Sequence, residues 1–251
     1  MISRNRIGPI THEIFVYEDD IKPANLLTVR EYRNTQVISP PRGYRRIRQT
    51  TLYNDLTIES DALLASFNAT TRNEVRKAQR AGVAVRVGSL ESLIPHFNAF
   101  ADQKCIAGRD IRSFDWMNGN VYVSEAVLAG AVLAMHSYFL CPEKAIVRLF
   151  TSASHFRASA NDRAIISAAN RYLHFADMLR FKELGFRIYD FGGQAPNDPD
   201  VSLRQISKFK QGFGGRSVDH YHYLSWQITP LKLIHQALRL ATITKLRPRV
   251  C

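Results

Sequence analysis

The residues best suited to chemistry lie between positions 185 and 215. Asp190 ends a short apolar run and Lys210 ends an amphipathic one, and each is followed by a pair of glycines. We predict a strand that ends near Asp190 and a helix that ends near Lys210, which brings both side chains to loops, where functional groups are often placed. A carboxylate there can act as a base on an amine or hydroxyl, and a lysine can stabilise a phosphate or a developing oxyanion. The alternatives are an aspartate that caps a turn and a lysine that faces solvent.

A second group of polar residues falls on a predicted β-hairpin. The apolar runs 125–140 and 146–154 are typical of two strands, with the turn near Glu143. Alternation along these strands places a set of polar side chains on one face: His136, Tyr138, Arg148, Ser152 and Ser154. A buried polar group without a partner costs about 1–3 kcal/mol, so we expect this face to line water or a ligand. A face that is merely solvated is the alternative.

The same hairpin predicts specific cross-strand neighbours. A turn centred on Glu143 places His136 opposite Phe150 and Tyr138 opposite Arg148, because the numbers of paired positions have a constant sum. A one-residue slip in the turn changes these pairs but leaves the alternation within each strand. His136 alone would be weak support for a catalytic site, because a single histidine in a strand is more often structural. The polar residues on the same face strengthen the prediction.

The surrounding elements follow from periodicity and from stop signals. We expect short strands and loops over 10–58. The elements that follow are a helix, a strand, a helix, a hairpin, a long helix, a strand, a short helix and a strand. In that order, their expected residues are 60–81, 83–87, 89–104, 125–154, 161–185, 186–191, a helix that ends at Lys210, and 217–226. This order indicates a mixed α+β protein of the α/β class. We divide the chain into N-terminal strands and loops over 1–50, a main domain over 51–228, and a basic amphipathic helix over 229–251.

Composition limits the function. The 251 residues include 45% hydrophobic residues, and the formal charge of +12 favours phosphate-bearing partners such as coenzyme A, a nucleotide sugar, tRNA or an anionic lipid surface. Three scattered cysteines indicate neither a disulfide framework nor a metal site, and no apolar run is long enough to span a bilayer. We expect a cytoplasmic protein, with peripheral contact at the inner face of the plasma membrane as a further hypothesis. ATPase, dehydrogenase, zincin and serine hydrolase motifs are absent from the sequence.

Several motifs resemble the FemAB-like branch of the GNAT acyltransferases. The resemblance covers roughly residues 50–226 and is carried by the order and spacing of five short segments: 70–82, 148–154, 170–175, 189–193 and 209–215. It implies a splayed mixed β-sheet flanked by helices, with an acyl donor in the splay and an amine or hydroxyl acceptor on the other side. It also implies that the helix starting near Asn161 points its N-terminus at donor phosphates.

Residue roles follow from that resemblance. His136 or Asp190 would act as the base on the acceptor, and Arg148 would hold an anionic part of a substrate. Tyr138, Ser152, Ser154 and Lys210 would contact substrate. The donor side is expected to include four further residues: Arg157, Arg163, Asn170 and Arg171.

Two departures from the family pattern shape the functional hypotheses. The usual GNAT pyrophosphate loop has no counterpart in 154–160. Full-length FemAB-type peptidoglycan enzymes carry two GNAT-like domains, whereas these 251 residues have room for one such domain and a reduced N-terminal portion. Our first hypothesis is an acyltransferase that uses an acyl-CoA donor, no metal, and a sugar or a nucleotide- or lipid-linked polysaccharide precursor as acceptor. The second is an aminoacyl transferase that uses aminoacyl-tRNA. The third is a non-catalytic module that binds polyanions or a membrane surface; DNA is not an expected partner.

Overall fold

The computed structural model describes residues 3–7, 10–103, 113–154 and 160–228. The chain forms two compact units: residues 50–218 make one, and residues 1–49 together with 219–251 make the other. Strands β4 (Tyr44–Asp55) and β10 (Arg216–Ser225) contribute residues to both units. Arg157 and the predicted helix over 229–251 lie outside the described residues.

The 50–218 unit contains a mixed sheet, in agreement with the predicted fold class. Its strand order is β4-β9-β8-β7-β6-β5, and the strands not yet given span the following residues: β5 Ala84–Val87, β6 Val121–Leu128, β7 Ala131–Cys141, β8 Ile146–Ser154 and β9 Ile188–Gln194. Only the β8–β9 pair in this series is parallel. A long connection through α4 (Ala160–Glu183) joins these two strands, as parallel pairing requires.

One predicted strand is two strands. The apolar run 125–140 is interrupted by a tight turn, in which Ala129 and Gly130 have φ of 49° and 82°. Two successive positive φ values are typical of a type I′ hairpin turn, whose twist matches that of the flanking strands. Gly130 was the only signal of this turn within the run, and apolar residues on both sides masked it.

The predicted cross-strand neighbours of the β7–β8 hairpin are also wrong. Tyr138 pairs with Leu149, because the turn pairs Cys141 with Ile146 and so lies one residue away from the predicted register. His136 pairs with Ser152, because the register shifts again at an irregularity between Ser137 and Tyr138. Arg148 pairs with Phe139 instead of Tyr138. Adjacent residues of a strand point to opposite faces, so Arg148 lies on the face opposite to Tyr138. The one-residue shift of the turn therefore separates Arg148 from Tyr138, and the extra residue at the irregularity brings Ser152 opposite His136.

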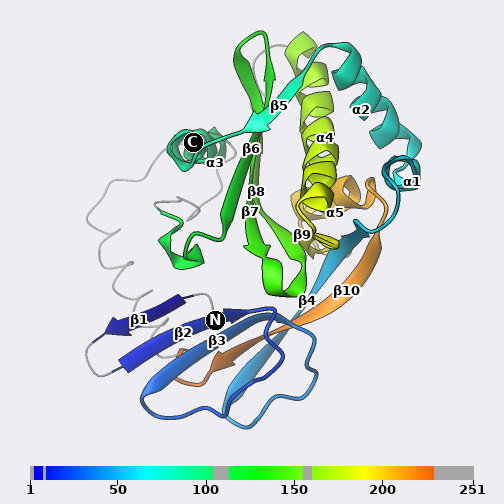
Figure 1. Cartoon of the computed structure of the whole chain (residues 1–251). Coiled ribbons are helices and arrows are strands. Elements are labelled where there is room, and N and C mark those ends of the chain that lie inside the picture. Colours follow the sequence, from blue (N-terminus) through cyan, green and yellow to red (C-terminus); the bar gives the residue numbers. More distant parts are fainter. Residues whose placement is uncertain (1–2, 8–9, 104–112, 155–159, 229–251) are drawn as a thin grey trace. The chain divides into compact units, whose positions relative to one another are not determined.

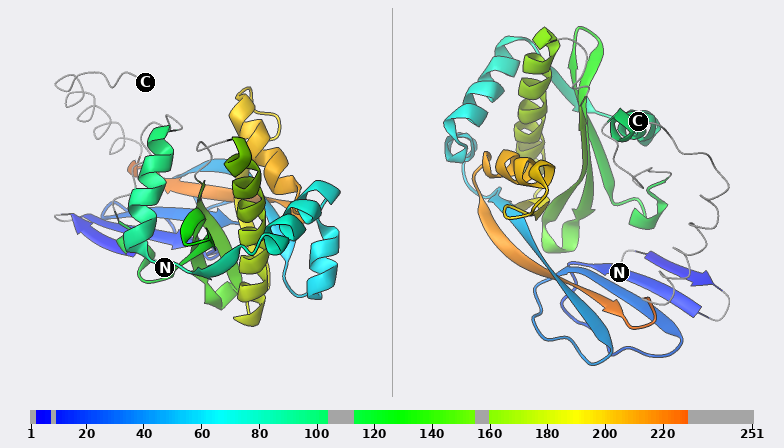
Figure 2. Two further views of the ribbon diagram at one scale, coloured as in Figure 1. Left: turned by 90° about the horizontal axis from the view of Figure 1, so that it is seen from above. Right: turned by 180° about the vertical axis from the view of Figure 1, so that it is seen from behind.

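Helices cover both faces of this sheet. Helices α2 (Ala69–Arg80) and α4 pack together on one face, and α3 (Leu90–Gln103) packs against β7 and β8 on the other (Figures 1 and 2). The helix predicted over 60–81 is divided into α1 (Ser60–Ser66) and α2, because Asn68 adopts extended backbone and its side chain accepts a hydrogen bond from the Thr71 amide. The last helix of the unit, α5 (Val201–Gln211), packs on β9.

The glycines after Lys210 allow the chain to pass close to other backbone. Gly214 and Gly215 have φ of 69° and 83°, and a Cβ atom added to Gly215 would lie 2.4 Å from the carbonyl oxygen of Tyr53. Other residues at Gly215 would meet both a steric clash and an unfavourable backbone conformation. This glycine pair therefore anchors the end of α5 against β4 and does not form an open loop.

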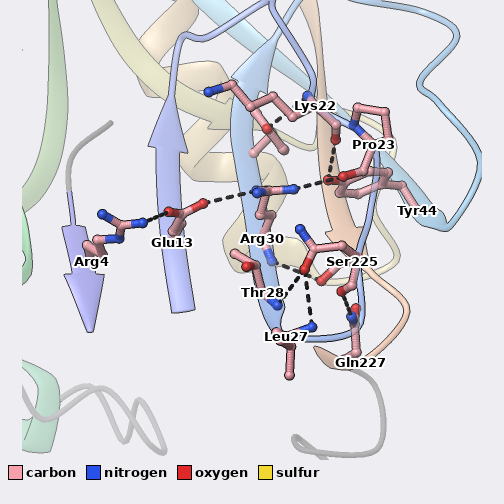
Figure 3. Close-up of polar contacts among 12 residues, drawn as sticks. Arg4, Glu13, Lys22, Pro23, Leu27, Thr28, Arg30, Tyr44, Ser225 and Gln227 are labelled. Carbon is pink, nitrogen blue, oxygen red and sulfur yellow. Dashed lines mark hydrogen bonds and ion pairs between the residues drawn. The ribbon is translucent and has the colours of Figure 1, made fainter. Parts of the chain in front are cut away.

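The other unit contains the strand order β1-β2-β3-β10, with β1 at Ser3–Ile7, β2 at Ile10–Val16 and β3 at Thr28–Thr35. Its aromatic core includes stacked rings of Phe15 and Tyr32. On the polar side of this core, Glu13 lies between two arginines from the neighbouring strands, as Figure 3 shows. The Glu13 carboxylate is 2.9 Å from Nε of Arg30 and 3.1 Å from a guanidinium nitrogen of Arg4.

We predict that Glu13→Ala destabilises the protein by about 3–5 kcal/mol, because it leaves the charge of Arg30 without its carboxylate. The Arg30 side chain is only 12% exposed, whereas that of Arg4 is 63% exposed. Arg4→Ala is the control and should cost less than about 1 kcal/mol, as exposed ion pairs do. Urea unfolding measures both values, and equal losses in the two variants would contradict the proposed importance of Arg30 burial.

Candidate active site

Strands β8 and β9 separate part-way along their length. Their parallel pairing begins at Ile146 with Ile188 and ends at Arg148 with Asp190. Beyond that point β8 stays paired with β7 as far as Ser154, while β9 stays paired with β4 as far as Gln194. We call the two diverging segments, 149–154 of β8 and 191–194 of β9, the fork. The predicted splay is therefore present in the sheet.

An ion pair occupies the base of the fork. Arg148 donates a hydrogen bond of 2.6 Å to Oδ2 of Asp190, and Oδ1 of Asp190 accepts hydrogen bonds from the amide of Gly192 at 2.7 Å and from the Thr51 hydroxyl. The Asp190 side chain is fully buried. Both carboxylate oxygens are thus engaged, and the aspartate holds in place both the backbone of β9 at Gly192 and the guanidinium of Arg148.

Lys210 lies at the β9 arm of the fork. Its ammonium group donates a hydrogen bond of 2.6 Å to the carbonyl oxygen of Gly193. The helix that carries Lys210 begins at the Asp200 cap, whose carboxylate accepts a hydrogen bond from the Ser202 amide. Lys210 is half-buried. A fixed positive charge beside a strand end can stabilise negative charge that develops on a bound carbonyl group.

A buried polar network lies between the sheet and α4. Asp177 of α4 is 1% exposed, and its Oδ2 accepts hydrogen bonds from Ser124 at 2.8 Å and from Tyr138. Nδ1 of His136 lies 3.1 Å from the same carboxylate oxygen. Nε2 of His136 is 2.8 Å from Oδ1 of Asn170. Both nitrogens of His136 therefore have partners.

The network reaches the fork on one side and extends under α5 on the other. Towards the fork, Ser152 donates a hydrogen bond of 3.3 Å to Asn170, and both residues are half-buried. On the other side, the Tyr138 and Tyr189 hydroxyls are 3.0 Å apart, and the Tyr189 hydroxyl is 2.8 Å from Nδ1 of His174. The network thus links β7, β8 and β9 through a single face of α4.

Burial sets the protonation of this network. Burial raises the pKa of Tyr138 and of Tyr189 well above the usual tyrosine value, and the nearby Asp177 carboxylate raises both further. Burial also lowers the pKa of His174 well below the usual histidine value, with a further lowering by His136. The two tyrosines are accordingly neutral hydroxyls, and His174 is a neutral imidazole at physiological pH.

The structure brings together only part of the predicted site. His136, Tyr138 and Ser152 lie on the α4 face, as expected, but the first two are fully buried and do not line an open cleft. Arg148 lies on the opposite face and forms its ion pair with Asp190. The expectation that His136, Arg148 and Asp190 share one groove is therefore wrong, for the register reason given above. Ser154 is half-buried at the end of β8.

The predicted donor-side residues differ in their surroundings. Arg163 is exposed on α4. Arg171 is half-buried: its guanidinium lies over the Phe209 ring, with Cζ 4.9 Å from the ring centroid, and it donates hydrogen bonds to Ser167. Asn170 belongs to the buried network, as described above. Arg157 lies outside the described residues.

Sequence analysis missed Asp177, His174 and Tyr189. A signal for two of them was present: Asn170, His174 and Asp177 follow one another at spacings of four and three, which places polar side chains along one stripe of a mostly apolar helix. Such a stripe must face polar partners. Tyr189 had no comparable signal, because an aromatic residue in a buried strand is usual.

Within the described residues, no group of three or more His, Cys, Asp or Glu side chains is placed to hold a metal ion. Among the helices of the described segments, none has the length and apolar character needed to cross a bilayer.

Comparison with known proteins gives matches in structure alone. No protein-family model and no curated protein matches the sequence. The crystal structure of FemX matches with a TM-score of 0.65 and 13% identity, over 92% of this chain and 85% of FemX. L-PGS from Bacillus licheniformis matches with a TM-score of 0.53 and 13% identity, over 90% of this chain and 80% of L-PGS.

A third structure is the C-terminal DUF2156 domain of an Agrobacterium fabrum protein assigned as a lysylphosphatidylglycerol synthetase. It matches with a TM-score of 0.53 and 14% identity, over 84% of this chain and 72% of that domain. At such identities the likeness establishes the fold. Together with the mixed sheet and the parting of β8 from β9, it shows that this chain has the GNAT-like fold in its FemAB-like form.

Proposed function

We propose that this protein is an acyltransferase that holds its acyl donor in the fork and transfers the acyl group to an amine or hydroxyl. The fork is the observation that carries this proposal, because the end of β8–β9 pairing at Arg148 and Asp190 leaves two strand segments between which an extended donor arm can lie. The fold shared with FemX and with lysylphosphatidylglycerol synthetase, an enzyme named for joining a lysyl group to a lipid, supports the same class of reaction.

The reaction assigns a role to Lys210. The acceptor nitrogen or oxygen attacks the acyl carbon, a new C–N or C–O bond forms, and the bond from that carbon to the donor sulfur or oxygen breaks. Negative charge develops on the acyl oxygen during the attack. The Lys210 ammonium, held 2.6 Å from the Gly193 carbonyl at one arm of the fork, is positioned to stabilise that charge.

The other predicted residues are proposed to bind or to position. Arg148 and Asp190 fix the base of the fork, and a role for Asp190 as the base is not favoured because both its oxygens have partners. On the donor side, Arg163 and Arg171 of α4 supply positive charge near the N-terminal half of that helix, where phosphates are also attracted by the helix N-terminus. Ser152, Ser154 and Asn170 supply hydrogen bonds beside the β8 arm.

The donor is proposed to be an acyl-CoA thioester, and the acceptor a sugar or a nucleotide- or lipid-linked polysaccharide precursor. A second candidate is aminoacyl transfer from aminoacyl-tRNA. The formal charge of +12 supports this second donor as well, because a basic protein attracts the phosphates of tRNA. Both candidate donors would bind in the same fork, so an experiment is needed to distinguish acyl-CoA from aminoacyl-tRNA.

The test is a transfer assay with purified protein. Thioester donors with a panel of amino sugars and sugar nucleotides should release free thiol, measured with a thiol reagent, if coenzyme A is the donor. Charged tRNA with the same acceptors should instead release free 3′-hydroxyl tRNA without any thiol. Salt-dependent binding to polyanions without transfer from either donor would contradict the proposal and support the non-catalytic module.

A further inference from the structure

One buried nitrogen of the network has no partner. His174 is fully buried, and its Nε2 makes no hydrogen bond to any of the residues that the structure describes. Nearly all buried polar side-chain atoms in proteins are hydrogen-bonded. The exception here is a lone pair on an imidazole, which is a group that accepts protons in many reactions.

The other nitrogen of His174 leads to a carboxylate through two tyrosines. Nδ1 is 2.8 Å from the Tyr189 hydroxyl, which is 3.0 Å from the Tyr138 hydroxyl, and Tyr138 donates to Asp177. One direction of donation satisfies every member: Nδ1–H of His174 donates to Tyr189, Tyr189 to Tyr138, and Tyr138 to the carboxylate. This direction leaves the lone pair of His174 on Nε2, the atom without a partner.

The ring of His174 lies beside the residues at the end of α5. Its centroid is 5.0 Å from that of Phe191, 5.7 Å from Phe209 and 5.1 Å from Phe213. Phe209 and its neighbour Lys210 are both half-buried. His174 is therefore close to the residue that we assign to oxyanion stabilisation, whose charge acts on the imidazole.

We propose that His174 is the base of the transfer reaction and that its Nε2 accepts the proton of the attacking amine or hydroxyl. This inference rests on the proposed acyltransferase function. His174 is fully buried, so this role requires the half-buried side chains of Phe209 and Lys210 to move aside when the acceptor binds. The role replaces the one predicted for His136, whose two nitrogens already have partners.

The proton and charge balance in this step. The acceptor N–H or O–H bond breaks as its electron pair forms the bond to the acyl carbon, and the proton moves to Nε2. The donor leaves as a thiolate or alkoxide and takes up a proton afterwards. The positive charge on His174 is stabilised through Tyr189 and Tyr138 by Asp177, as an aspartate stabilises the imidazolium in a catalytic triad.

The neighbouring ring of His136 affects the protonation of His174. The rings of His136 and His174 are stacked with centroids 4.0 Å apart, and two imidazolium ions at that separation repel each other strongly. The Coulombic interaction with His136 accordingly lowers the pKa of His174. The other charged or titratable groups around His174 come from β7, β9, α4 and α5: Tyr138, Tyr189, Arg171, Asp177 and Lys210.

The pH dependence of kcat/KM distinguishes a base from a packing residue. A base must be unprotonated, so activity should be lost as pH falls through its pKa, and burial lowers the pKa of His174 well below the usual value of 6.5. We expect the acidic limb of the wild-type profile to lie below pH 6.5. In His174→Phe, the residual activity should no longer show this limb.

The test compares variants of the full chain with the donor that proves active. His174→Phe keeps an aromatic ring among the three phenylalanines, and we expect kcat to fall by about 10²-fold or more, as loss of a general base commonly causes. Tyr172→Phe removes a hydroxyl from the same helix outside the relay and should leave kcat within about twofold. Thermal melting and circular dichroism establish that each variant is folded.

A second variant distinguishes the loss of a catalytic base from a loss of folding. His174→Ala leaves space for a small base, and added imidazole should restore a substantial part of the lost activity, which it would not do for a residue that only packs. Wild-type kcat in folded His174→Phe would overturn the role of His174 and leave the acyltransferase proposal intact. No turnover by the wild type with any donor would instead overturn the acyltransferase proposal and this role with it.

Discussion

Replacement of Lys210 by alanine should lower kcat by about 10²–10³-fold, the usual effect of removing one group that stabilises an oxyanion. The ammonium of Lys210 is held by the Gly193 carbonyl at the β9 arm of the fork, so its charge needs little reorganisation when the acyl oxygen becomes negative. KM for the donor should change less than kcat, because the interaction strengthens in the transition state. Steady-state kinetics with the active donor measures both parameters.

Lys208 provides the matched control. It lies two residues earlier on the same helix and is exposed, so Lys208→Ala should have wild-type kcat within about twofold. Loss of the Lys210 hydrogen bond should reduce the free energy of unfolding by only about 1 kcal/mol. A Lys210→Ala variant that is folded and fully active would remove Lys210 from the mechanism, whereas equal losses in both lysine variants would point to a general effect of charge.

Asp190→Ala should destabilise the protein by about 3–5 kcal/mol, because it leaves the Arg148 guanidinium without its carboxylate. The Arg148 side chain is only 16% exposed, and the same substitution removes the acceptor for Thr51 and for the Gly192 amide. Chemical unfolding measures the loss. In a double-mutant cycle, Arg148→Ala with Asp190→Ala should cost clearly less than the sum of the single changes.

Asp190→Asn separates the structural role from a catalytic one. The amide keeps the shape of the side chain but removes the charge and the acceptor capacity of one oxygen, so it should reduce stability while the folded fraction retains kcat within about tenfold. A folded, stable Asp190→Asn variant that has lost its activity would contradict our assignment and would restore Asp190 as a candidate base.

Local patterns predicted most elements of the 50–218 unit. The end of the first predicted helix at residue 81, the long apolar periodicity after residue 160 and the alternation over 217–226 correspond to the end of α2, to α4 and to β10 in the structure. The splay between strands was an implication of the family resemblance, and the structure confirms it at Arg148 and Asp190. The helices and strands depend on residues close together in the sequence, and the splay was inferred from the order of the motifs. Both kinds of information can be read directly from the sequence.

The candidate site was less predictable, because it depends on register. The hairpin pattern correctly grouped His136, Tyr138 and Ser152, but a turn that pairs Cys141 with Ile146, one residue away from the predicted register, placed Arg148 on the other face. The sequence pattern has no local marker for this one-residue shift of the turn. The division of the chain into two units could likewise not be read from local patterns, because it depends on contacts between segments that are far apart in the sequence.

By itself, the sequence determined the basic charge, most of the order of helices and strands, and the polar positions His136, Asp190 and Lys210. Only the tertiary structure decided which of these meet. It paired Asp190 with Arg148 and placed Asp177 and His174 of α4 beneath β7 and β9. The physical reason is that alternation and helical period are encoded over a few residues, whereas hydrogen bonds between residues such as His136 and Asp177 depend on strand register and on how a helix packs against the sheet.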